Sequence, residues 1–484
     1  MPERSPTLDP SDWPAFRRDL HALVDACVDH LEHVGERPWR PLDERARARL
    51  ALGDAHAGAG VSATANELVT SVLPYHAGNT HPRFFGWVQG TGTVAGLMAE
   101  IVAATMNSNC GGRDHGAIEV ERQVIRWCAD CFGLPAAASG VLTTGTSQAT
   151  VIGLAAARLQ ALGADSRRQG IRGGPPLTLY AAEGVHNATV KAAELLGLGS
   201  QALRLIPVDP VRGSMDIERL AEVVARDRDA GLRPMCVVGT AGSVDRGGFD
   251  RLDHLADFCA AERIWLHVDG AFGAWARLAD EPWRDLVRGI DRADSLALDF
   301  HKWMFVQYDC GLILLRDEAR HRAAFAARPA YLAAQDAGLG GGEPWFCDYG
   351  VDLSRGFRAL KVWSTLRAYG SVQLGAAITR NCRLAAAMAQ QVASTPELTL
   401  LARVDANVCC FSVIADGQDV DALNTRIVQR LQQDGSAVFS TTRIEGRTAI
   451  RAAITNHRTT PEDVRLAIAA VVLARAAMLG ELAV

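Results

Sequence analysis

The sequence predicts an α/β protein whose sheet is mostly parallel and is covered by helices on both faces. Two observations support this prediction. Short apolar runs of strand length recur after residue 140, and a helical stretch separates each run from the next. The expected strands are 177–181, 202–207, 235–239, 264–268, 295–297 and 312–315. Ligands of such sheets bind at the carboxyl ends of the strands, so we expect a functional site there.

The segments on either side of this region predict two further units. Apolar positions at helical spacing indicate a helix over 12–33, and glycine and aromatic residues indicate a loop over 82–92. Near the C-terminus, helices alternate with strands near 408–414 and 449–454. We therefore expect an N-terminal helical arm with a substrate loop (1–95), a large domain (96–368) and a small C-terminal α/β domain (369–484).

Composition and charge narrow the classes of function. The chain has 484 residues and a net charge of -5, without the basic surplus of nucleic-acid-binding proteins. The N-terminus is polar and proline-rich, so we expect no signal peptide, and no uncharged apolar run reaches the roughly 18 residues of a membrane span. Eleven cysteines predict buried thiols in a reducing cytoplasm. A metal site at Cys128 and Cys131 is a weak alternative because no matching ligands lie nearby in the sequence.

Lysine is rare in this chain, which limits where covalent amine chemistry can occur. Three of the 50 lysine and arginine residues are lysines, namely Lys191, Lys302 and Lys361. An arginine guanidinium stays protonated and cannot form an imine. Lys191 and Lys361 fall in helical patterns, whereas Lys302 follows the end of the 295–297 strand, in a semi-apolar setting that can activate an amine as a nucleophile. Lys302 is therefore the candidate.

A turn of glycine, threonine and serine over 140–150 leads directly into a helical run. Free N–H groups at a helix N-terminus, together with the hydroxyls of Thr146 and Ser147, form an arrangement that binds phosphate. The P-loop and GxGxxG patterns do not occur at this turn, which weakens a nucleotide interpretation. An ordinary helix cap by Thr146 or Ser147 is the alternative.

Two more polar residues follow predicted strands. Asp269 comes directly after the apolar strand 264–268. A buried carboxylate at this position costs free energy unless a cation or a hydrogen-bond donor contacts it. A protonated pyridine nitrogen would be such a partner, and the small Ala271 leaves space beside a flat ring. The alternative for Asp269 is a cap on the following helix. His186 follows the strand 177–181 and can face the same crevice, although a lone histidine is more often structural.

In this order, these segments resemble the pyridoxal-phosphate-dependent group II decarboxylases, the family of aromatic-L-amino-acid and glutamate decarboxylases. The residues that carry the resemblance are His186, His267-Val-Asp269 and His301-Lys302-Trp303. The resemblance covers 81–363 and returns weakly at 453–460, which is most of the chain. It implies an aspartate-aminotransferase-like (fold type I) transferase with a mostly parallel seven-stranded sheet. It also implies a homodimer with active sites at the subunit interface.

The resemblance implies roles for individual residues. Lys302 would hold pyridoxal 5'-phosphate (PLP) as a Schiff base, Asp269 would pair with the ring nitrogen, and His186 would stack on the ring. Further cofactor contacts would come from Thr146, Ser147, Thr240, Ala271 and His301. The substrate pocket would be lined by Trp87 and Gln89, and no metal is expected.

The implied reaction is decarboxylation of an L-amino acid, with an aromatic one favoured, to the amine and carbon dioxide through an aldimine on Lys302. The ring withdraws electrons while its nitrogen stays protonated, which a carboxylate at Asp269 would enforce. Family members carry a tyrosine on a mobile loop at the position of Tyr331, where it helps to deliver a proton to the alpha carbon. Because this chain keeps Tyr331, we expect simple decarboxylation rather than oxidative release of an aldehyde.

Departures from the family pattern concern the substrate pocket. Asp299-Phe300 stands where many aromatic members have Asn-Pro, and Gln89 stands where proline is common. Arg113 and His115 could meet a substrate carboxylate or stabilise a loop. These differences leave open a decarboxylase for glutamate, aspartate or cysteine sulfinate, or decarboxylation coupled to oxidative deamination or transamination. A nucleotide-dependent oxidoreductase and a cofactor-free scaffold protein are the alternatives from other classes.

Overall fold

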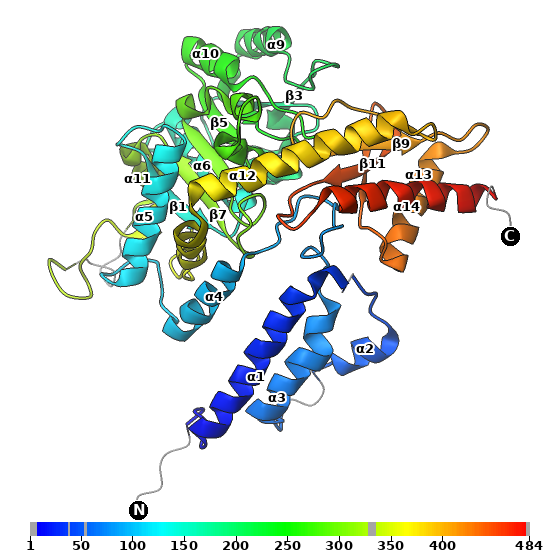
Figure 1. Cartoon of the computed structure of the whole chain (residues 1–484). Coiled ribbons are helices and arrows are strands. Elements are labelled where there is room, and N and C mark those ends of the chain that lie inside the picture. Colours follow the sequence, from blue (N-terminus) through cyan, green and yellow to red (C-terminus); the bar gives the residue numbers. More distant parts are fainter. Residues whose placement is uncertain (1–6, 37–38, 53–55, 328–334, 481–484) are drawn as a thin grey trace, which may run out of the picture.

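The computed structural model describes residues 7–36, 39–52, 56–327 and 335–480 of the chain. Figure 1 shows a large α/β body, a smaller unit near the C-terminus, and an arm of N-terminal helices that extends away from the body. Most residues singled out in the sequence belong to the large body.

A seven-stranded sheet forms the centre of the large body, which confirms the predicted, mostly parallel sheet. In spatial order its strands are β1 (Ser139–Thr143), β7 (Gly311–Leu315), β6 (Ser295–Asp299), β5 (Trp265–Asp269), β4 (Arg233–Thr240), β2 (Leu177–Ala182) and β3 (Leu203–Ile206). The strands from β6 to β3 run parallel, while β7 runs antiparallel to both of its neighbours. The carboxyl ends of β2, β4, β5 and β6 therefore meet at one edge.

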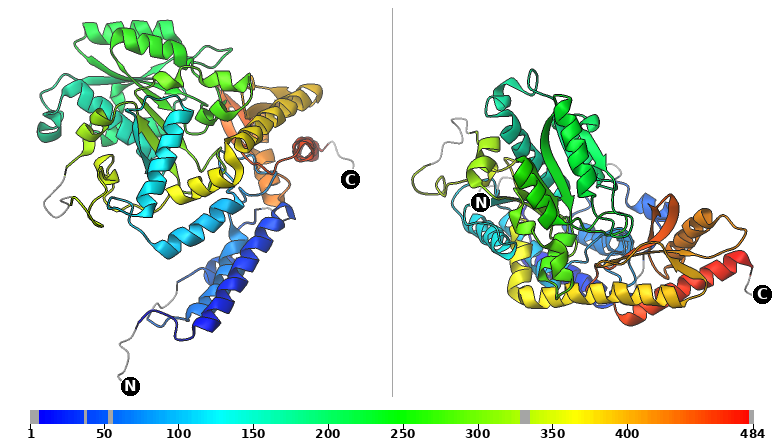
Figure 2. Two further views of the ribbon diagram at one scale, coloured as in Figure 1. Left: turned by 60° about the vertical axis from the view of Figure 1, so that its left-hand side comes forward. Right: turned by 90° about the horizontal axis from the view of Figure 1, so that it is seen from above.

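Helices cover both faces of this sheet (Figure 2). The His267 ring of β5 lies against Gly153 of α6 (Thr146–Leu162) on one face. Successive side chains of a strand point to opposite faces, so Leu266 lies on the other face, where α10 (Leu252–Glu262) packs. The other helices between residues 94 and 325 are α4 (Val94–Met106), α5 (Gly116–Cys131), α7 (Ser166–Gln169), α8 (Asn187–Leu195), α9 (Ile217–Asp229) and α11 (Glu318–Phe325).

The edge strand β1 differs from the sequence prediction. Residues 139–143 pair antiparallel with β7, whereas the sequence suggested a turn over 140–150. Gly140 looked like a turn residue, but it permits close packing within the sheet, because a Cβ there would come within 2.8 Å of the Ile313 carbonyl oxygen. The turn is therefore shorter than expected, and α6 begins at Thr146.

A second sheet with its own apolar core forms near the C-terminus. Its strands, in spatial order, are β10 (Ser440–Ile444), β11 (Arg447–Ala453), β9 (Val408–Val413) and β8 (Leu398–Leu400). Strands β9 and β11 match the predicted ones, while β8 and β10 were not predicted. Its helices are α13 (Val420–Asp434) and α14 (Pro461–Leu479). The long helix α12 (Ala359–Ser394) contacts both units and leaves helical geometry at Gly370 (φ 65°, ψ 164°), next to the predicted boundary.

The N-terminal arm contains α1 (Trp13–Glu32), α2 (Glu44–Arg49) and α3 (Val61–Glu67). The start of α1 agrees with the predicted helix, because the Asp12 carboxylate accepts a hydrogen bond from the Ala15 N–H at 2.9 Å. Large apolar side chains are exposed on this arm and on α4, which follows it. They include Trp13, Leu20, Val28, Val61, Leu68, Val72, Val94, Met98, Ile101, Val102 and Met106.

A buried ion pair ties β1 to the rest of the large body. The guanidinium of Arg355 pairs with the carboxylate of Glu121 in α5, and the two side chains are 1% and 0% exposed. The backbone of Leu142 in β1 bonds to both partners: its N–H donates to Glu121 at 3.1 Å, and its carbonyl accepts from Arg355 at 2.7 Å. Arg355 also donates to the Cys110 carbonyl at 2.8 Å. The pair therefore joins α5, β1 and two loops.

We predict that Arg355→Met lowers the free energy of unfolding by about 3–5 kcal/mol, because it leaves the Glu121 carboxylate buried without its cation. Denaturant unfolding of the purified protein measures this loss. Arg219→Met is the matched control, since Arg219 and its partner Glu222 are 59% and 57% exposed, and an exposed pair contributes about 1 kcal/mol or less. Equal losses in the two variants would contradict the prediction.

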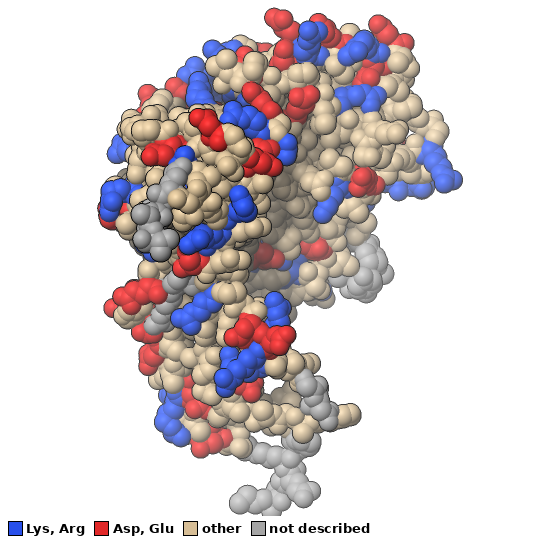
Figure 3. Space-filling model, turned by 90° about the vertical axis from the view of Figure 1, so that its right-hand side faces the viewer, with Lys and Arg blue, Asp and Glu red and all other residues tan. Residues whose placement is uncertain are grey.

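Figure 3 shows basic and acidic side chains interspersed over one face of the molecule. Among the described helices, none combines the length and the apolar character that a bilayer span requires. The described residues also include no group of three or more potential metal ligands, and Cys128 and Cys131 are free thiols in α5.

Candidate active site

A cavity of about 590 Å³ lies at the carboxyl ends of β4, β5 and β6. The predicted site residues that line it are Trp87, Thr146, Ser147, His186, Thr240, Asp269, Ala271, His301 and Lys302. Tyr331 lies outside the described residues. Gln89 is not among the lining residues, whereas its neighbour Val88 is. The Gln89 carbonyl accepts a hydrogen bond from Thr455 at 2.7 Å, and a role for its side chain in substrate binding stays a prediction.

Lys302 follows the end of β6 and pairs with a carboxylate from that strand. Its Nζ lies 2.9 Å from Oδ2 of Asp299, whose side chain is 2% exposed. The other oxygen of Asp299 accepts a hydrogen bond from the Thr146 N–H, at the N-terminus of α6, over 2.7 Å. Asp299, which departs from the family pattern, therefore points into the site. One carboxylate holds both the lysine and the turn before α6.

The two other lysines lie outside this cavity. Lys361 is buried in α12, where it pairs with Glu100 at 2.6 Å and donates to the Tyr308 carbonyl at 3.2 Å. Lys191 is exposed on α8. Of the three amines in the chain, the one on Lys302 is therefore the one placed for chemistry on a ligand in the cavity.

Asp269 places a buried carboxylate on the cavity wall at the end of β5. Its side chain accepts a hydrogen bond from the Ala271 N–H at 3.1 Å, and the residue is 5% exposed. Burial raises the pKa of the Asp269 carboxyl, and the nearby Lys302 and His186 oppose this rise. A cationic ligand group against Asp269 would compensate the desolvation of the carboxylate.

Two histidines approach the cavity from different elements. His186 caps α8, where its Nδ1 accepts from the Ala188 N–H at 3.2 Å. His301 is held by its Nδ1, which accepts from the Cys310 N–H at 3.0 Å. Its ring also packs against Tyr308, with centroids 4.2 Å apart. Burial lowers the pKa of His301, which keeps its ring neutral beside Lys302.

The wall near α6 fits a phosphate-bearing cofactor. The hydroxyl oxygens of Thr146, at the start of α6, and of Thr240, at the end of β4, are buried on the cavity wall without hydrogen-bond partners. Buried polar groups are normally satisfied, so unpartnered hydroxyls on a cavity wall indicate a polar ligand. The first turn of α6 adds the positive end of the helix dipole, although its Thr146 N–H already donates to Asp299. With an amine at Lys302 and an anion at Asp269, these groups match the phosphate, aldehyde and ring nitrogen of pyridoxal phosphate.

Among the lining residues that sequence reasoning missed are Asp245, Tyr308 and Arg451. Arg451 in β11 is 3% exposed, and its Nη2 is buried without a hydrogen-bond partner. An arginine inside the apolar strand 449–454 was a usable signal for this residue. Asp245 lies in a polar turn after β4, where an aspartate attracts no notice.

The loop that carries Trp87 is attached closely to the lysine turn. The Gly90 N–H donates to the His301 carbonyl at 3.2 Å. A Cβ at Gly90 would lie 2.3 Å from that oxygen and 2.4 Å from the Lys302 carbonyl oxygen, so this contact requires glycine. Arg113 instead lies 4.4 Å over the Trp345 ring, which favours the interpretation that it stabilises a loop.

Comparisons with known proteins agree with this geometry. Residues 64–414 match the family model of the pyridoxal-dependent decarboxylase conserved domain. An aromatic-L-amino-acid decarboxylase of Bacillus atrophaeus is 28% identical over 92% of each chain. An L-2,4-diaminobutyrate decarboxylase of Rhizobium meliloti is 29% identical over 84% of this chain and 80% of its own. The crystal structure of Oryza sativa TDC with PLP and tryptamine has a TM-score of 0.88 at 27% identity, covering 98% of this chain and 100% of its own.

The family match spans most of the chain and includes β5, which carries Asp269, and the turn after β6, which carries Lys302. The similarity to the rice enzyme extends over nearly the whole chain and confirms the fold type I architecture. The relatives named above differ in substrate at similar identity, so the comparisons identify the chemistry and the cofactor but not the amino acid. The chain belongs to the pyridoxal-dependent decarboxylase family and is a PLP-dependent amino-acid decarboxylase.

Proposed function

We propose that this enzyme converts aromatic L-amino acids to the corresponding amines and carbon dioxide. The observation that carries the proposal is the composition of the cavity, in which Lys302 and Asp269 share one space with the aromatic rings of Trp87 and Tyr308. Aromatic side chains are the natural contact surface for an aromatic substrate. The similarity to an aromatic-L-amino-acid decarboxylase supports the same substrate class.

Bound PLP supplies an electron sink for the electron pair that remains when carbon dioxide leaves. The residues of the chain prepare the site for this chemistry. Lys302 offers the amine that holds the cofactor, and the Asp269 carboxylate keeps a proton on the ring nitrogen. The hydroxyls of Thr146 and Ser147 would bind the phosphate together with the N-terminus of α6, and Thr240 would contact the cofactor from the end of β4.

The remaining steps concern the substrate and the final proton. His186 lies at the cavity wall where it can cover the ring of the cofactor. The unpartnered Nη2 of Arg451 is a fixed positive group that orients the substrate through its carboxylate. Tyr331, in the segment outside the described residues, would deliver a proton to the alpha carbon after the carboxylate has left.

The second candidate is a decarboxylase for acidic amino acids. Arg451 supports it, because a buried guanidinium with a free N–H could bind a side-chain carboxylate instead. The carboxylate of Asp245 on the wall of the same cavity opposes it, since a second substrate carboxylate would meet like charge. The aromatic substrate is therefore the better match.

We predict that kcat/KM for the best aromatic amino acid exceeds that for glutamate, aspartate and cysteine sulfinate by about tenfold or more, a difference equivalent to about 1.4 kcal/mol. The assay offers tyrosine, tryptophan and phenylalanine alongside the acidic substrates and quantifies carbon dioxide, amine and aldehyde. Preference for an acidic substrate would replace the proposal with the second candidate. Aldehyde with hydrogen peroxide would instead indicate oxidative deamination.

We also predict that borohydride reduction of the holoenzyme attaches a pyridoxyl group to Lys302, because its amine is the lysine amine that lines the cavity. Peptide mass spectrometry locates the label, and loss of the yellow colour reports the reduction. Lys302→Ala should remain unlabelled, whereas the exposed control Lys191→Ala should be labelled normally. A label on Lys191 or Lys361 would overturn the assignment of the lysine.

We further propose that the enzyme is a cytoplasmic homodimer with active sites at the subunit interface. The exposed apolar side chains of the arm and of α4 support dimerisation, because water-exposed apolar patches of this extent are typical of association surfaces. A cytoplasmic location agrees with eleven free cysteines, most of them buried.

We predict that Met98→Glu with Val102→Glu converts the dimer to monomers in sedimentation velocity, because charges on α4 would have to be buried in the interface. These side chains are 60% and 50% exposed in the single chain. Val211→Glu is the matched control, since Val211 is 74% exposed on the turn after β3 and should leave the dimer intact. A monomeric wild-type enzyme would refute dimerisation.

A further inference from the structure

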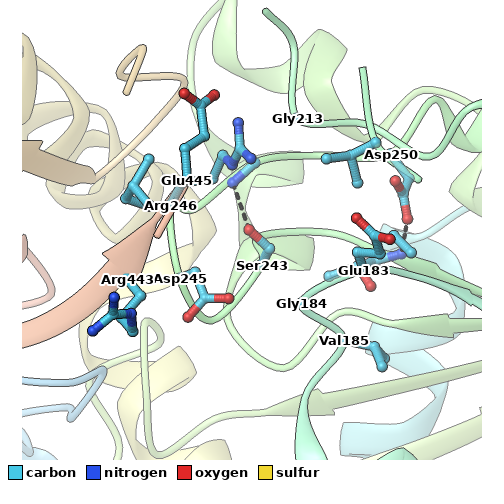
Figure 4. Close-up of a pocket in the computed structure, with 15 residues that line it drawn as sticks. Glu183, Gly184, Val185, Gly213, Ser243, Asp245, Arg246, Asp250, Arg443 and Glu445 are labelled. Atoms are coloured by element: carbon cyan, nitrogen blue, oxygen red, sulfur yellow. Dashed lines mark hydrogen bonds between the residues drawn. The ribbon is translucent and has the colours of Figure 1, made fainter. Parts of the chain in front are cut away.

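Asp245 places a carboxylate where two cavities meet. It lines the large cavity that contains Lys302, and it also lines a smaller one of about 150 Å³. Figure 4 shows the smaller cavity, with Asp245 on its wall between Arg443 of β10 and Gly184 of the turn after β2. The Asp245 Oδ2 would lie 2.9 Å from a Cβ at Gly184, so the carboxylate reaches across the gap between these elements.

The C-terminal sheet holds Asp245 in place while leaving part of its carboxylate available. Its Oδ1 accepts a hydrogen bond from the Thr442 hydroxyl at 2.8 Å. Its main-chain carbonyl accepts from Nε of Arg451 at 2.9 Å. Within the described part of the chain, no lysine, arginine or histidine forms an ion pair with this carboxylate. The carboxylate oxygen not bonded to Thr442 can therefore accept a hydrogen bond from a ligand.

Arg451 and Asp245 give the substrate side of the cavity one fixed cation and one fixed anion. The Nη1 of Arg451 donates to the Trp87 carbonyl at 2.8 Å, while its buried Nη2 has no partner. Both residues line the cavity that contains Lys302. If the guanidinium takes the carboxylate of the amino acid, the Asp245 carboxylate is a fixed anion on the same cavity wall that the substrate side chain can meet. An acceptor or a second carboxylate there would be repelled, whereas a donor would be bound.

We propose that Asp245 determines substrate specificity by accepting a hydrogen bond from the substrate side chain. The substrate class is then an amino acid whose side chain ends in a donor, such as a phenol O–H, an indole N–H or an ammonium group. Side chains without a donor, as in phenylalanine, or with a carboxylate, as in glutamate, are disfavoured. The proposal rests on the decarboxylase function and narrows its substrate.

The competing explanation is structural. Asp245 could serve only to join the turn after β4 to the C-terminal sheet through Thr442. Loss of that contact would change stability and would affect all substrates alike. A change in the ratio between substrates that differ by one donor distinguishes the two roles, because a structural contact has no means of sensing the substrate side chain.

The test compares tyrosine with phenylalanine, which differ by one hydroxyl. In the wild-type holoenzyme we expect kcat/KM to favour tyrosine by about tenfold to a hundredfold, the range for a hydrogen bond to a charged group. Asp245→Ala should bring this ratio close to one. Asp245→Asn should keep part of the preference for tyrosine, since its amide oxygen still accepts, and should lose any preference for 2,4-diaminobutyrate. Glu445→Gln, which neutralises an acid of the smaller cavity only, should leave the ratio unchanged.

A binding measurement separates failure of this proposal from failure of the aromatic assignment. Calorimetry on the borohydride-reduced enzyme, which cannot turn over, should show the same donor preference and its loss in Asp245→Ala. Preference for 2,4-diaminobutyrate over phenylalanine that depends on Asp245 would support the role of Asp245 and refute an aromatic substrate. The role of Asp245 would be refuted if the wild type prefers neither tyrosine nor 2,4-diaminobutyrate over phenylalanine, or if Asp245→Ala leaves such a preference intact.

Discussion

The active site depends on the register of three parallel strands. Backbone pairing sets Thr240 of β4 beside Asp269 of β5, and Asp269 beside Ala297 of β6. The three strands therefore end close together, and the chain turns from β6 directly to Lys302. Because side chains alternate along a strand, a slip of one residue would turn Asp269 towards the opposite face. The chemistry of the site is thus tied to the apolar core that fixes this register.

The two halves of the cavity have different origins. The cofactor half comes from the large sheet and from the turn before α6, which the buried pair of Glu121 and Arg355 anchors through β1. The half that we propose binds the substrate combines the loop around Trp87 with Arg451 from the C-terminal sheet. The loop around Trp87 and the C-terminal sheet are far from the cofactor-binding segments in sequence, so their residues can change without altering the cofactor site. This agrees with the two relatives, which act on different amino acids although each is similarly identical to this chain.

The sequence predicted strands and site residues correctly where the pattern lies in neighbouring residues. Apolar runs revealed the strands from β2 to β7, and Asp269 and Lys302 stood out because each follows such a run. Strand β1 was missed because Gly140 is explained by the Ile313 carbonyl of a strand far along the chain. Asp245 and Arg451 share a site only after the C-terminal sheet has packed against the large body, and no pattern near either residue encodes that contact.

The contact at Gly90 separates fixed from variable positions within a single loop. A side chain at Gly90 would collide with the backbone of His301 and Lys302. Substitution of this glycine is therefore excluded on steric grounds, whatever the substrate. Trp87, slightly earlier in the loop, is 54% exposed and meets no such barrier. Substitutions around Trp87 can therefore change the substrate preference without displacing Lys302. The sequence of the loop can vary near Trp87 because Gly90 fixes the loop against the backbone of His301 and Lys302.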